Sequence, residues 1–110
     1  MPTNKLLSML GMARRAGRLS MGHDAAKKSV KTKKARLLLF CSDVSPGLVR
    51  EFKSIAEGSN LPIPVINLNF TMDEVYFSTG GRAGVITVDD ENFSRKIISL
   101  SGQEEHVNGN

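Results

Sequence analysis

Residues 37–41 read Leu-Leu-Leu-Phe-Cys, an uninterrupted apolar run that strongly restricts the possible folds. A strand with one face in water alternates apolar and polar side chains, whereas an unbroken apolar run is typical of a strand that is covered on both faces. We therefore expect residues 37–41 to form a central strand, with helices packed against both sides of its sheet.

The rest of the chain alternates short apolar segments with amphipathic helical patterns. Strands are predicted at residues 18–21, 63–67 and 84–88, and the prolines at 62 and 64 favour a sheet edge for the second of these. Helix starts are predicted at Thr3 or Asn4, Gly22, Ser45, Thr71, and Asp89 or Asp90. The second helix offers a small inner face made of Ala25, Ala26, Ser29 and Val30.

These elements together predict an α/β fold, a three-layer α/β/α sandwich with a small, mixed sheet of about four strands. The last helix is expected to run through Leu100. One domain over residues 1–100 and a polar, disordered tail over residues 101–110 are the expected organisation.

Composition excludes several classes of protein. No apolar run approaches the roughly 20 residues of a membrane span, and residues 1–5 lead into a helical pattern and not a signal peptide, which indicates a cytoplasmic protein. One cysteine and two separated histidines make a metal site improbable. The glycines at 80–84 join a helix to a strand, the reverse of a dinucleotide-binding loop, and no nucleophile motif is present. We expect no cofactor and no catalysis.

Charge is distributed very unevenly along the chain. Residues 1–36 hold ten bases and one acid, a net charge of +9, whereas the other 74 residues hold five bases and ten acids, a net charge of −5. One surface must therefore be strongly basic, which favours a polyanionic partner.

Most of this basic charge lies on the second predicted helix. At about 100° per residue, Asp24, Lys28 and Lys31 share a face, and Lys27, Lys31 and Lys34 form an adjoining row. Six bases occur between positions 27 and 36 with no acid among them, and their mutual repulsion favours nucleic-acid contact over a plain solvated surface.

The start of this helix suggests how such contact is made. Gly22 allows another backbone to approach closely, and the free amides of the first turn favour phosphate. Asp24 repels phosphate but can accept hydrogen bonds from a guanine edge. From the residues alone, a simple helix-capping role for Asp24 stays open.

Three segments carry a resemblance to a known family. The stretch Leu-Gly-Met-Ala-Arg-Arg-Ala-Gly-Arg-Leu at 10–19, followed by Gly22-His23-Asp24 and the lysine-rich helix, resembles the bacterial YlxQ-type members of the kink-turn-binding ribosomal protein ("L-seven-Ae") family. Residues 35–46 and 83–93 match the second strand with its following loop and the final strand with its helix. The resemblance spans residues 4–100.

The resemblance implies an α/β/α sandwich that binds kink-turn RNA, a sharply bent duplex whose bulge is flanked by sheared G·A pairs. In the family a Gly-x-Asn-Glu-x-x-Lys stretch reads the guanines; Gly22 and Lys28 keep its ends, while Asp24 and Ala25 replace the central pair. It implies a monomeric binder of ribosomal or other structured RNA. Expected RNA-binding residues are Arg14, Gly22, His23, Asp24, Lys27, Lys28, Lys31, Lys34, Ser45, Val49, Gly81, Arg82 and Ala83.

Three alternatives remain. The chain could be a general structured-RNA binder without kink-turn specificity, or a module that docks an acidic protein, although scarce exposed aromatics argue against the latter. A third reading is a stand-alone relative of the substrate-recognition domain of RNA methyltransferases.

Overall fold

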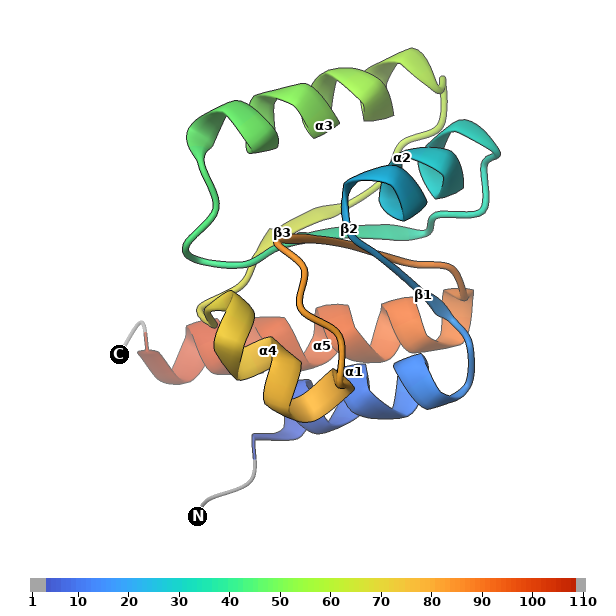
Figure 1. Cartoon of the computed structure of the whole chain (residues 1–110). Coiled ribbons are helices and arrows are strands. Elements are labelled where there is room, and N and C mark those ends of the chain that lie inside the picture. Colours follow the sequence, from blue (N-terminus) through green and yellow to red (C-terminus); the bar gives the residue numbers. More distant parts are fainter. Residues whose placement is uncertain (1–3, 109–110) are drawn as a thin grey trace.

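The computed structural model describes residues 4–108, and the side chains of residues 4–102. Within this range the elements, in chain order, are α1 (Lys5–Arg15), β1 (Leu19–Met21), α2 (His23–Lys31), β2 (Leu37–Phe40), α3 (Pro46–Gly58), β3 (Val65–Asn67), α4 (Met72–Thr79), β4 (Val85–Val88) and α5 (Glu91–Asn108) (Figure 1). None of these helices is long and apolar enough to cross a lipid bilayer.

The four strands form one mixed sheet in the order β1-β4-β2-β3. Strand β4 is antiparallel to both β1 and β2, whereas β2 and β3 are parallel. All four residues of β2 are buried between β4 and β3, so the prediction of a central strand is confirmed. Strand β3 lies at an edge, as the prolines at 62 and 64 predicted.

Helices cover both faces of the sheet (Figure 1). Helices α2 and α3 lie on one face, and α1, α4 and α5 lie on the other. The side chains of β2 divide accordingly: Leu37 and Leu39 pack into a core with Leu10, while Leu38 and Phe40 pack with Phe52 of α3. The predicted three-layer α/β/α sandwich is confirmed.

Most helix starts are those that the sequence predicted. The Asn4 Oδ1 accepts hydrogen bonds from the Leu6 and Leu7 amides, and Thr71 with Glu74 forms a capping box at α4. The alternative cap Thr3 lies outside the described residues. Helix α2 also starts where predicted, directly after Gly22, whose φ of 97° is rare for other residues, and no described side chain caps it.

The lysine-rich helix is shorter than predicted. Lys33 adopts a left-handed φ of 63°, and the Lys34 amide donates to the Ser29 carbonyl at 3.0 Å, which closes the helix after Lys31. The sequence predicted a helical row of Lys27, Lys31 and Lys34. This prediction is wrong for Lys34, which lies beyond the end of the helix. The expected inner position of Ala25 is also wrong, since this residue is exposed.

Helix α5 continues past Leu100, its predicted end, to Asn108. A disordered tail at 101–110 stays a prediction, because the side chains of 103–108 and all of 109–110 lie outside the description. Of the two candidate caps for this helix, Asp90 is the cap: its Oδ2 accepts from the Phe93 amide at 2.8 Å.

Asp89 instead ties three elements together. Its Oδ1 accepts hydrogen bonds from the Ser29 hydroxyl of α2 at 2.6 Å and the Thr87 hydroxyl of β4 at 2.8 Å, and its Oδ2 accepts from the Ser20 hydroxyl of β1 at 2.5 Å. Ser29 and Thr87 are buried. This carboxylate fixes the lysine-rich helix to the sheet.

Candidate nucleic-acid interface

The start of α2 presents backbone donors, a carboxylate and lysines together. The Gly22 amide donates to the Val85 carbonyl at 3.0 Å, which anchors the turn to β4. The next amides point out of an uncapped helix end, where the helix dipole favours an anion. The side chain of Asp24 is fully exposed. Lys28 is exposed and Lys27 is half-buried.

Two further loops meet this helix start. The loop from β2 to α3 carries Ser45, and the loop from α4 to β4 carries residues 80–84. The Cys41 amide donates to the Gly84 carbonyl at 2.9 Å, and a Cβ at Gly84 would lie 2.5 Å from Val44 Cγ1. The Val85 carbonyl also accepts the hydrogen bond from the Gly22 amide. The start of α2, the loop from β2 to α3 and the loop from α4 to β4, which were predicted separately, therefore lie side by side.

Two arginines flank the loop from α4 to β4. The Arg14 guanidinium contacts the sulfur of Met21 and fills the space into which a side chain at Gly81 would project. Arg82 turns back toward α4, and its Nε donates to the Asp73 Oδ1 at 2.9 Å. Both arginines are exposed, so they extend the basic surface beyond α2.

Several expected contact residues are placed less favourably. Ala83 is buried, and its carbonyl accepts from the Cys41 thiol at 3.3 Å. The Ser45 hydroxyl accepts from the Leu48 amide at 3.2 Å as the cap of α3, and Val49 is half-buried. Ala83 and Val49 therefore offer little free polar surface, whereas Ser45 is exposed but its hydroxyl already accepts the capping hydrogen bond.

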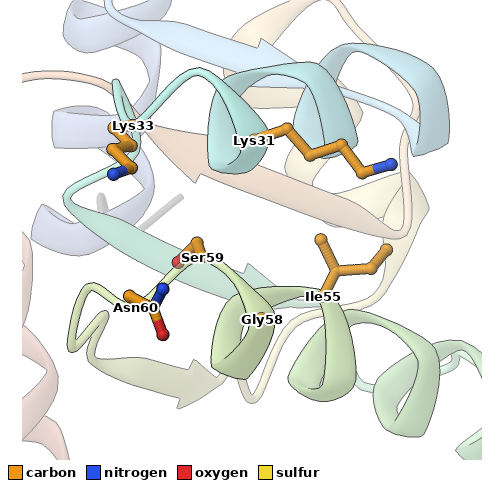
Figure 2. A pocket seen from close by; sticks show the side chains of 6 residues that line it. All are labelled: Lys31, Lys33, Ile55, Gly58, Ser59 and Asn60. Atoms are coloured by element: carbon orange, nitrogen blue, oxygen red, sulfur yellow. The ribbon is translucent and has the colours of Figure 1, made fainter.

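Lys31 ends α2 at the opposite end from Gly22, and Lys34 lies just beyond this end. An open hollow of about 480 Å³ lies between the ends of α2 and α3. Figure 2 shows Lys31 and Lys33 on the α2 side of this hollow and Ile55 and Asn60 on the α3 side. At 1.5 Å per residue, this end lies about 13 Å from the start of the helix. The lysines therefore form a track along α2 and not one compact cluster.

Glu51 of α3 is a member of the site that sequence reasoning missed. The His23 Nε2 lies 2.8 Å from Glu51 Oε2, its Nδ1 lies 3.3 Å from Asp24 Oδ1, and its ring packs edge-on against Phe52. Glu51 and then Asp24 raise the pKa of His23 above 6.5 by accepting its hydrogen bonds. Glu51 is 28 positions away in sequence, so no local pattern could reveal this bridge.

The bridge predicts a pH-dependent contribution to stability. A histidine whose pKa is raised by folding stabilises the protein. This stabilisation is fully present when the pH is below the unfolded-state pKa near 6.5, and it is lost as the pH rises through the folded-state pKa. We expect His23→Gln to lower the free energy of unfolding more at about pH 5.5 than at about pH 8.5. Urea unfolding of both proteins at each pH checks this; a difference that is constant or grows with pH would contradict it.

Cys41 is a buried thiol in the core of the fold. Burial raises the pKa of the Cys41 thiol to about 11, so the nucleophilic thiolate is scarce at neutral pH. No group of three or more histidine, cysteine or acidic side chains is placed to hold a metal in the described part of the chain.

Comparison with known proteins gives three results. The sequence profile of the ribosomal protein L7Ae/L30e/S12e/Gadd45 family matches residues 4–73. A Bacillus halodurans protein of unknown function has a similar structure, with a TM-score of 0.81 and 28% identity over 91% of this chain and 99% of that one. The Giardia lamblia 15.5kD RNA binding protein shares the fold, with a TM-score of 0.69 and 15% identity over 96% of this chain and 92% of that one. A search among curated proteins found no match.

Proposed function

Because this chain belongs to the ribosomal protein L7Ae/L30e/S12e/Gadd45 family, we propose that it is a non-catalytic protein that binds a kink-turn or a similarly bent RNA. The observation that carries the proposal is the start of α2, where an exposed carboxylate stands beside lysines at an uncapped helix end. A surface meant for phosphate alone would not place Asp24 there, because like charges repel. A surface that reads guanine next to phosphate needs both an acceptor and cations.

In this proposal the residues divide by chemistry. Gly22 lets the RNA approach the first-turn amides, and Asp24 accepts hydrogen bonds from guanine. His23 holds Asp24 in place through the contact at 3.3 Å. Phosphates are neutralised by Arg14, Lys27, Lys28, Lys31, Lys34 and Arg82, while Ser45, Val49, Gly81 and Ala83 form the edge of the site.

A titration against two matched RNAs tests the function. One is a duplex with a bulge flanked by G·A pairs, and the other is a straight duplex of the same length and composition. We expect tighter binding to the bent RNA at two salt concentrations. Equal affinity for both would refute kink-turn recognition, and no binding to either would refute RNA binding.

Removing one phosphate contact should act on all RNAs equally. We expect Lys28→Ala to weaken binding to both duplexes and to reduce the slope of log K against log salt by about one, because one fewer counterion is released. Lys96→Ala is a matched control, since this exposed lysine belongs to α5 on the other face of the sheet. A change in slope with the control, or none with Lys28→Ala, would contradict the assignment.

Two other candidate functions each have one supporting observation. Ala25 is exposed and apolar where the resemblance places glutamate, which favours a general structured-RNA binder. Phe77 is 86% exposed, which favours a protein-docking module and weakens the argument from scarce aromatics. An acidic partner that remains bound after nuclease treatment would support docking.

We further propose that the protein is a cytoplasmic monomer associated with ribosomal RNA, with its binding activity in residues 1–100.

A further inference from the structure

Helix α4 exposes two neighbouring aromatic side chains. Phe77 is 86% exposed and Tyr76 is 47% exposed, with ring centroids 6.1 Å apart in an edge-to-face arrangement. The other phenylalanines are buried (Phe40, Phe52) or half-buried (Phe70, Phe93). An exposed phenylalanine keeps its apolar surface in contact with water, an unfavourable arrangement that a partner covering the ring would remove.

This aromatic pair is continuous with the candidate interface. Asp73 precedes Phe77 by four residues, so both lie on one face of α4. Arg82 donates to Asp73 at 2.9 Å, and its guanidinium therefore reaches from the interface loop onto the face that carries Phe77. Figure 1 shows α4 leading directly into this loop. The Arg14 guanidinium lies against Gly81 of the same loop.

The charges around the pair favour a neutral, flat occupant. Asp73 and Glu74 are exposed beside Phe77, which disfavours an acidic peptide or a run of phosphates directly on the rings. A nucleobase carries no charge and stacks on aromatic rings, while a neighbouring guanidinium can hold its phosphate. A bulged RNA supplies such an unpaired base.

We propose that Phe77, supported by Tyr76, stacks on an unpaired nucleobase of the bound RNA, with Arg82 beside the nucleotide's phosphate. This inference rests on the proposed function and adds a base-binding position outside the guanine-reading start of α2.

The chain contains no tryptophan, so Phe77→Trp creates a single fluorescent reporter at this position. We expect its emission to be quenched by an RNA with an unpaired base, saturating with binding, and not by the same duplex without the bulge. Phe77→Leu should weaken binding to the bulged RNA by about 5- to 150-fold, the range for one base–aromatic stack, and leave the paired duplex unchanged.

Ile98→Trp is the matched control, because Ile98 is also exposed but belongs to α5. Its emission should not respond to the bulge. If Phe77→Trp is not quenched and Phe77→Leu binds like the wild type, while the wild type still prefers bent RNA, the stacking proposal fails and the proposed function stands. An equal loss on both RNAs with Phe77→Leu would also overturn stacking. Wild-type protein that binds neither RNA would overturn both proposals.

Discussion

Replacing Asp24 by alanine is expected to lower affinity for the bent RNA by about 5- to 150-fold while leaving affinity for a straight duplex unchanged or slightly higher. The loss follows from the guanine contact, since a good pair of hydrogen bonds to a base edge discriminates by about 1–3 kcal/mol. The slight gain follows from removing a charge that repels phosphate. Asp24 is fully exposed and its described side-chain contact is with His23, so the fold should remain intact.

Anisotropy titrations of both RNAs measure these opposite effects directly. Glu91→Ala is a matched control, because it removes an exposed carboxylate of α5 that pairs with Arg95, in the layer across the sheet. Asp24→Asn should fall between the wild type and Asp24→Ala, since the amide keeps one acceptor oxygen for the guanine edge but loses the second acceptor oxygen and the negative charge of the carboxylate. Equal losses on both RNAs would show that Asp24 supports the helix and does not read a base.

The layers of the fold were predictable because they depend on local patterns. The apolar run at 37–41 required cover on both faces, and the cores on the two sides of β2 provide it. Capping also acts over three or four residues, so Asn4, Ser45 and Thr71 could be recognised as helix starts.

The features that sequence could not reveal join distant residues or depart from local preference. Glu51 reaches His23 across 28 positions, and Ser20 reaches Asp89 across 69. The end of α2 depends on Lys33, a residue that seldom adopts a positive φ and gives no signal as glycine would.

Phe77 shows a different limit of sequence reasoning. An aromatic residue in an amphipathic helix predicts a core position, but α4 buries Val75 and turns Phe77 outward. The segments that carry the expected site residues lie side by side, but the sequence did not show that a neighbouring helix exposes an aromatic side chain.

Asp89→Ala is expected to lower the free energy of unfolding by about 3 kcal/mol. Hydrogen bonds to a charged group are worth about 1.5–3 kcal/mol each, and this carboxylate accepts three, two of them from the buried hydroxyls of Ser29 and Thr87. Alanine would leave those hydroxyls without their acceptor. The half-buried position of Asp89 admits water, which keeps the expected loss below the sum of three full contributions.

Urea unfolding of Asp89→Ala, Asp89→Asn and Ser20→Ala separates the causes. The amide of Asp89→Asn retains one acceptor oxygen and should lose less than alanine, while Ser20→Ala removes one bond and should cost about 1 kcal/mol. Because Ser29 ties α2 to this carboxylate, the folded Asp89→Ala protein should also bind bent and straight RNA more weakly by the same factor, unlike Asp24→Ala. A loss of stability below about 1 kcal/mol, or a selective loss on bent RNA, would contradict an anchoring role, since anchoring positions the whole lysine-rich helix and not one base contact.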